Sequence, residues 1–167
     1  RILLSPARPE KHSSATAHSP GSLRHRRWRD GRTGTRSFAC RDSGVPRSWV
    51  AGGDVPGVNL LSGLDRDAVS SVKARIDAVK QHFDIAIASI HWGGNWGYDV
   101  QLSHRRFAHA LVEEAGVDLV HGHSSHHVKG WELHDGKLIL YGCGDLLNDY
   151  EGISGQEEYR SDLSALY

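Results

Sequence analysis

The sequence predicts an α/β fold, because helical and strand-like patterns alternate along its second half. Residues 65–83 carry apolar side chains at spacings of three and four, the period of one helix face. Residues 84–90 follow at once as a short apolar run rich in β-branched residues, which is typical of a buried strand. The same order recurs over residues 104–115 and 117–120. A helix that leads directly into a buried strand, twice, indicates a parallel sheet with helices packed on it.

Capping residues mark where the two helices begin and end. Asp65 can cap the first helix, and Asp67 lies favourably in its first turn. Ser103 is the expected cap of the second helix, and Gly116 fits the left-handed position that closes it. The inner faces are expected to consist of Val69, Val72, Ile76, Val79 and Phe83 in the first helix and of Phe107, Leu111 and Val112 in the second.

Loops and a hairpin are expected on either side of these elements. Residues 43–63 are rich in Gly and Pro and predict a loop in which Trp49 packs against the domain. Residues 131–134 and 137–141 flank Asp135-Gly136, the strongest short hairpin signal. The chain beyond Asp145 is polar and is expected to be irregular.

Residues 1–37 differ in composition from the rest of the chain. They hold nine basic and two acidic residues, a net charge of +7, and the remainder carries −7. Their apolar residues follow no period, so they cannot bury enough surface to offset the conformational entropy of folding. We expect a disordered, functionally empty basic arm that can be removed without harm; a non-native reading frame is a further interpretation. The Arg-rich run at residues 24–29 is short and lies on no helix pattern, so we expect no nucleic-acid partner.

Cysteine spacing and hydropathy limit the classes of function. Cys40 and Cys143 lack the paired spacing of a zinc or redox motif, and free buried thiols are favoured over a disulfide. No apolar run reaches the roughly 18 residues of a membrane span. The chain contains no Met, which indicates a fragment or a processed product.

A cluster of histidines, residues 121–127, follows the second predicted strand. Imidazole is the commonest protein metal ligand and suits zinc, iron, nickel and copper; a solvated His-rich loop is the alternative. Gly122 would let the backbone bend sharply between two of these histidines. His91 follows the first strand, and two parallel strands joined by one helix end at the same sheet edge. We therefore expect His91 and His123 to be neighbours, within about 10 Å, because bridged metals lie only roughly 3.5–4 Å apart.

The residues themselves predict a metal site made of His91, His123 and His126. Asp145 is a possible fourth ligand or outer group, and His91 and Asp145 are the candidate catalytic residues. A metal with an open position lowers the pKa of a bound water and so makes a nucleophile near neutral pH. Carboxylates that could hold the second ring nitrogens are Asp99, Asp118 and Asp145. Ordinary surface or packing roles are expected for His104, His109, His121 and His127.

Several short motifs occur in an order and spacing that resemble one protein family. They are Ser43-Gly44-Val45-Pro46 with Trp49, Pro56-Gly57-Val58-Asn59-Leu60, His91-Trp92-Gly93, Gly116-Val117-Asp118-Leu119-Val120, Gly122-His123, His126, Gly130 and Tyr141-Gly142-Cys143-Gly144-Asp145. The set is similar to the CapA-type capsule synthesis proteins, the poly-γ-glutamate biosynthesis branch of the calcineurin-like metallophosphoesterase superfamily. The resemblance covers residues 38–167.

This resemblance implies a fold, a function and partners. It implies the C-terminal part of a metallophosphoesterase-like α/β/β/α sandwich, preceded by the arm of residues 1–37. In the intact parent it implies a metal-dependent phosphoesterase-like hydrolase of capsule or poly-γ-glutamate synthesis, with a di-metal centre of Mn, Zn or Fe. The substrate would be an anionic polymer or a phosphoester, and the partner an envelope biosynthesis complex. The implied location is the cell envelope, with the cytoplasm as the alternative.

The chain departs from the family at several points. It has Asn95 where members commonly carry Glu, and Asp145-Leu146 where they commonly have Asn-Phe. Residues 1–37 contain neither the early Asp motif nor the Asn-His motif that complete a two-metal site. We therefore expect this chain to bind divalent metal weakly and not to hydrolyse phosphoesters by itself. The alternative function is a non-catalytic, polymer-handling or scaffold component of an envelope assembly complex.

Overall fold

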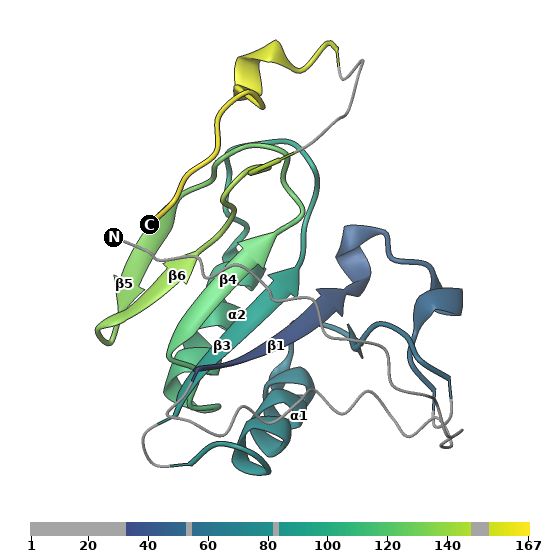
Figure 1. Ribbon diagram of the computed structural model, residues 1–167, viewed down its shortest axis with the longest axis vertical. Coiled ribbons are helices and arrows are strands. Elements are labelled where there is room, and N and C mark those ends of the chain that lie inside the picture. Colours follow the sequence, from purple (N-terminus) through teal and green to yellow (C-terminus); the bar gives the residue numbers. More distant parts are fainter. Residues whose placement is uncertain (1–32, 53–54, 82–83, 148–153) are drawn as a thin grey trace, which may run out of the picture.

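The computed structural model describes residues 33–52, 55–81, 84–147 and 154–167 and arranges them around one sheet (Figure 1). The strands and helices are β1 (Thr33–Cys40), β2 (Leu60–Leu61), α1 (Arg66–Asp77), β3 (Ile85–His91), α2 (Leu102–Glu113), β4 (Leu119–His123), β5 (Trp131–His134) and β6 (Lys137–Leu140). Short 3-10 turns occur at Arg41–Ser43, Arg47–Trp49 and Glu157–Tyr159.

Among the described residues, the sheet has six strands in the order β2-β1-β3-β4-β6-β5. All neighbouring pairs are parallel except β5 and β6, which form an antiparallel hairpin at one edge. Helix α1 leads into β3, and α2 connects β3 to β4. The predicted α/β fold is confirmed, with one mixed sheet and two α-helices in the part of the chain that the structure describes.

The two faces of the sheet differ in burial. Ala86, Ala88 and Ile90 of β3 and Val120 of β4 are buried in one core cluster with the apolar side chains of α1 and α2. The two helices also contact each other. The alternate residues of the two strands point to the opposite face, because side chains alternate along a strand. That face is half-buried along β3 from residue 87 and along β4, and its polar members are Ser89, His91, His121 and His123.

Helix α1 begins as expected and ends early. The Asp65 side chain caps it by accepting a hydrogen bond from the Ala68 N–H, at 2.9 Å. The helix ends at Asp77, so the expectation that it runs to residue 83 is wrong, and Val79 is exposed. Beyond the helix, Lys80 donates hydrogen bonds to the Gly116 carbonyl oxygen and the Asp118 carboxylate. Phe83 lies outside the described residues.

Helix α2 begins one residue before its predicted cap. Gln101 occupies the capping position without a side-chain hydrogen bond, and Ser103 lies inside the helix, so the prediction of Ser103 as the cap is wrong. The C-terminal prediction is confirmed, because Gly116 has a φ of 71° and closes the helix in the left-handed region.

Strand β1 was not expected. It begins at Thr33, so residues 33–37, the end of the predicted disordered arm, form a strand. It lies between β2 and β3 and pairs with β3 from Thr33 to Ala39. Its local sequence shows little apolar periodicity, and pairing with a strand some 50 positions away stabilises it instead. The rest of the arm, residues 1–32, lies outside the described residues.

The loop and hairpin predictions had different outcomes. Trp49 is 60% exposed, so the expectation that it packs against the domain is wrong, whereas Leu61 in β2 is buried. The β5–β6 hairpin is confirmed, and Asp135 and Gly136 have the positive φ values, 49° and 72°, that its tight turn requires.

The two cysteines do not form a disulfide, as the sequence predicts. Cys40 and Cys143 are free thiols, and burial raises the pKa of Cys40 to about 12, with Asp42 adding to the shift. Within the described ranges, no helix is long and apolar enough to cross a membrane.

Candidate functional site

His91 and His123 form the centre of the candidate site. They are register partners at the ends of parallel strands β3 and β4, and their side chains extend from the same face of the sheet. Their Nδ1 atoms lie 3.2 Å apart and their ring centroids 5.2 Å apart. The prediction that these two histidines are neighbours is confirmed.

Both imidazoles favour the neutral form, which is the form that binds metals. Burial lowers the pKa of His123 to about 4, and the nearby His91 and His121 add to the shift. Burial also lowers the pKa of His91; the charge of Asp42 opposes this and that of His126 adds to it. The pair therefore offers two lone-pair nitrogens at neutral pH rather than two cations.

His126 lies near this pair but does not complete a three-ligand group. Its Nδ1 is 2.7 Å from the Asp145 carboxylate, and its ring packs against Trp96. In the described part of the chain, no group that contains His91, His123 and His126 brings its ligand atoms within 4.8 Å of one another. Asp145, proposed as an outer group, does hold a ring nitrogen of His126, and its proposed role in catalysis stays a prediction.

Asp42 and His104 are site residues that the sequence analysis missed. Asp42 follows β1 directly, and its carboxylate lies 2.7 Å from Nε2 of the buried His104. Asp42 also acts electrostatically on His91. Residues 33–37 were expected to belong to a disordered arm, so no strand was predicted that would place Asp42 at the carboxyl edge of a sheet.

The other predicted carboxylates do not hold histidines. Asp118 accepts hydrogen bonds from Lys80, Lys137 and the Ala86 N–H, so its assignment to a histidine is wrong. Asp99 is exposed, and its carbonyl oxygen accepts a 3.4 Å hydrogen bond from Lys129. His121 is held by Ser89 through its Nδ1, at 3.1 Å, next to the His91–His123 pair.

Gly122 matters to the site because its missing side chain leaves room for a neighbouring residue, and not because the backbone bends there. It lies inside β4, and a Cβ there would come within 2.4 Å of Nε1 of Trp92. The indole fits against the strand only because this position has no side chain. Trp92 Nε1 donates a hydrogen bond to the Tyr141 carbonyl oxygen, at 3.3 Å, and this bond fixes the residue that follows His91.

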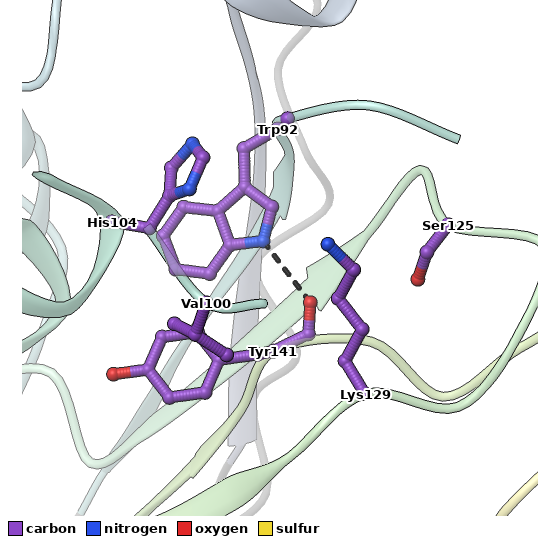
Figure 2. Close-up of a pocket in the computed structure, with 7 residues that line it drawn as sticks. Trp92, Val100, His104, Ser125, Lys129 and Tyr141 are labelled. Carbon is purple, nitrogen blue, oxygen red and sulfur yellow. Dashed lines mark hydrogen bonds between the residues drawn. The ribbon is translucent and has the colours of Figure 1, made fainter. Parts of the chain in front are cut away.

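A small pocket includes one of the histidines, His104, in its wall. Its lining consists of Trp92, Gly93, Val100, His104, Ser125, Lys129 and Tyr141. Figure 2 shows Lys129 extending its amino group toward the Trp92 indole, beside the Trp92–Tyr141 hydrogen bond. Burial lowers the pKa of Lys129, and Asp99 opposes that shift. The pocket therefore combines an aromatic wall with a partly desolvated amine, a combination suited to an anionic group.

His127 has a structural role, as the sequence analysis expected. It is fully buried, and its Nδ1 donates to the Val128 carbonyl oxygen at 3.1 Å. Its ring stacks on Trp96 and Tyr159, which joins the residues after β3 to the C-terminal segment. Burial lowers its pKa, so it is neutral in this aromatic setting.

These features define the class of protein: an α/β domain with neutral histidines gathered where its parallel strands end. Open α/β sheets place their ligand sites at this edge. The chain belongs to the family of bacterial capsule synthesis proteins called PGA_cap. Residues 11–150 match the family model described as bacterial capsule synthesis protein PGA_cap. The match begins within the segment that was expected to be a functionally empty arm.

Three relatives support this membership. The chain is 52% identical over 132 residues to a probable polyglutamine synthesis accessory protein of Mycobacterium tuberculosis, in strains CDC 1551 / Oshkosh and H37Rv. That alignment covers 78% of this chain and 34% of each relative. The chain is also 32% identical over 74 residues to the PGA biosynthesis protein CapA of Bacillus subtilis (strain 168), covering 44% of this chain and 19% of the relative. The chain thus spans about a third of the M. tuberculosis relatives it matches.

Proposed function

We propose that this chain is the part of a CapA-like capsule or poly-γ-glutamate synthesis protein that carries two histidines of a metal-dependent phosphoesterase-like site. The observation that carries the proposal is the His91–His123 pair, with ring nitrogens 3.2 Å apart and neutral imidazoles at the carboxyl edge of the sheet. Family membership supports the biological context, since the relatives are described as proteins of polyglutamine or PGA synthesis.

The donor set fits part of a metal centre. Two neutral imidazoles suit zinc or iron, and His91 and His123 would hold the ion between them. A catalytic site usually needs three protein ligands, and a two-metal site needs more, so the remaining ligands would come from other parts of the longer protein. Such an ion supplies Lewis acidity toward a phosphoryl oxygen and lowers the pKa of a bound water.

The chain's own residues would position substrate and protons around that centre. Asp145 holds Nδ1 of His126 and so orients its ring, which suits His126 for proton transfer or for metal binding. Asp42 fixes His104 at the wall of the pocket. Lys129 would bind an anionic group of the substrate, which agrees with a phosphoester or a polymer of carboxylates.

The test is hydrolysis of a chromogenic phosphodiester by a full-length protein that contains this chain, with Mn²⁺ or Zn²⁺ added. We expect turnover that a chelator abolishes and that His123→Ala reduces at least 100-fold, the order of magnitude of a lost catalytic group. Lys73→Gln, on the exposed side of α1, is the control and should retain activity.

A second measurement separates the two classes of function. Absence of turnover with either metal, together with retained binding of anionic polymer, would reject the enzyme in favour of a polymer-handling scaffold protein. For the 167-residue chain alone, we expect no turnover, because the described residues supply too few ligands.

A further inference from the structure

A second group of potential metal ligands lies between helix α2 and strand β5. His109 and Glu113 are four residues apart on α2 and therefore share one helix face. His134 is the last residue of β5. The rings of His109 and His134 stack with centroids 3.7 Å apart and an interplanar angle of 7°, and Nε2 of His134 lies 2.6 Å from the Glu113 carboxylate.

These three side chains have the chemistry and spacing of a zinc site. Each offers one ligand atom, and the three atoms lie within 4.8 Å of one another. Two imidazoles and one carboxylate are a ligand set that zinc sites use, with bonds of about 2.0–2.2 Å and water in the fourth position. Ligand atoms around a tetrahedral zinc are then about 3.4 Å apart. In the stacked arrangement the two ring planes are parallel, so at least one imidazole must rotate out of the stack before both rings can face the same ion. All three side chains are partly exposed, which leaves room for this rotation.

Glu132 forms the hydrogen bond to His109 that a carboxylate usually forms to a metal-binding histidine. Its carboxylate lies 2.7 Å from Nε2 of His109 and accepts further hydrogen bonds from Arg105 and the Tyr141 hydroxyl. An ionised carboxylate that holds one ring nitrogen orients the imidazole and leaves the other nitrogen for a metal.

This cluster lies at the opposite end of the sheet from the His91–His123 pair. His134 is the register partner of Lys137, where β6 begins, and β6 runs parallel to β4. His91 and His123, in contrast, lie where their strands end. The hairpin turn in Figure 1 is correspondingly at the far end of the sheet from the tips of β3 and β4.

We propose that His109, Glu113 and His134 bind a divalent transition-metal ion, with zinc as the best match to the donors. An ion held by one strand and one helix would fasten the edge hairpin to α2. Within the described ranges, β5 is the outermost strand of the sheet and pairs with β6 alone. The site would therefore stabilise the fold and would not take part in the chemistry at the other edge.

The test is calorimetric titration of the 167-residue chain with Zn²⁺, beside thermal melts with and without Zn²⁺. We expect Glu113→Gln and His134→Gln each to remove one bound zinc per chain, or to weaken it more than 10-fold, and to abolish the zinc-dependent rise in melting temperature that this site provides. Glu114→Gln changes the adjacent, exposed carboxylate of the same helix and should bind zinc like the wild type.

Two further variants distinguish this site from the His91–His123 pair. His123→Ala should leave the Glu113-dependent zinc in place, and Glu132→Gln should weaken it about 10- to 100-fold, the usual effect of losing a carboxylate behind a metal-bound histidine. Melts without metal show whether each variant folds. Unchanged zinc binding in folded Glu113→Gln and His134→Gln chains would overturn the proposal, as would loss of all zinc binding in His123→Ala.

Discussion

At the scale of single residues, the candidate site depends on pairs that face each other across neighbouring strands. Ser89 lies opposite His121, and His91 lies opposite His123, so two histidines meet because two strands share a register. A shift of one residue would turn these side chains into the helix-covered core. The buried Ala88, Ile90 and Val120 prevent that shift, since they must stay on the helix side.

Gly122→Ala should destabilise the protein by about 1–3 kcal/mol, the usual cost of overpacking a well-packed region. A Cβ at this position would lie 2.4 Å from Nε1 of Trp92 and would displace the indole from the Tyr141 carbonyl oxygen. Urea unfolding measures the change. Gly130→Ala is the matched control, because a Cβ there meets nothing within 4 Å. Equal stability of the two variants would show that Trp92 can move without cost.

At the scale of secondary-structure elements, single polar side chains decide where elements end and how they are joined. Asp118 precedes β4 and joins the segment after α1, the start of β3 and the start of β6. Its partners are Lys80 at 2.6 Å, the Ala86 N–H at 2.9 Å and Lys137 at 2.5 Å. Burial acts to raise the pKa of Asp118, but the two lysines and the backbone N–H lower it to about 2.

Asp118→Asn should lower stability at neutral pH by about 2 kcal/mol, since the pKa of Asp118 falls from 3.8 to about 2 on folding. A lowered folded-state pKa stabilises the protein above pH 3.8, and that contribution is lost as the pH falls toward 2. The difference between wild type and variant should therefore shrink over this range, as followed by urea unfolding from pH 7 to pH 2. A difference that is independent of pH would contradict this account.

Asp65→Ala should destabilise the protein by about 1 kcal/mol, the typical value of a lost helix cap. The Asp65 side chain satisfies the Ala68 N–H in the first turn of α1, and alanine leaves it without this partner. Asp77→Ala is the control, since it removes only an exposed ion pair with Lys73, worth less than about 0.5 kcal/mol. Urea unfolding compares the two, and a larger loss in Asp77→Ala would argue against the capping role.

At the scale of the whole molecule, β1 makes residues 33–37 part of the domain. These residues pair with residues 85–89 of β3 in an inner position of the sheet. Stability of a domain is a small difference between large terms, about 5–15 kcal/mol in total, so loss of an inner strand is a large fraction of it.

A chain that starts at Phe38 should therefore melt at a much lower temperature than one that starts at Thr33, or fail to fold. The first lacks five of the eight residues of β1, and the second keeps the strand complete. Thermal melts followed by circular dichroism compare the two. Equal melting temperatures would support the expectation that the whole of residues 1–37 is dispensable.

The sequence by itself determined the features that depend on neighbours in the chain. Helix periodicity, the Asp65 cap, Gly116 and the Asp135-Gly136 turn all rest on local backbone preferences. It also placed His91 beside His123, because the rule for strands joined by one helix converts order in the chain into position at a sheet edge.

Tertiary structure alone decided the features that depend on distant partners. Strand β1 forms through pairing with β3, and Asp42 meets His104 although 62 positions separate them. Lys80 likewise binds Asp118, 38 positions away. Local sequence carries no sign of such contacts, because their free energy comes from groups that meet only once the sheet has assembled.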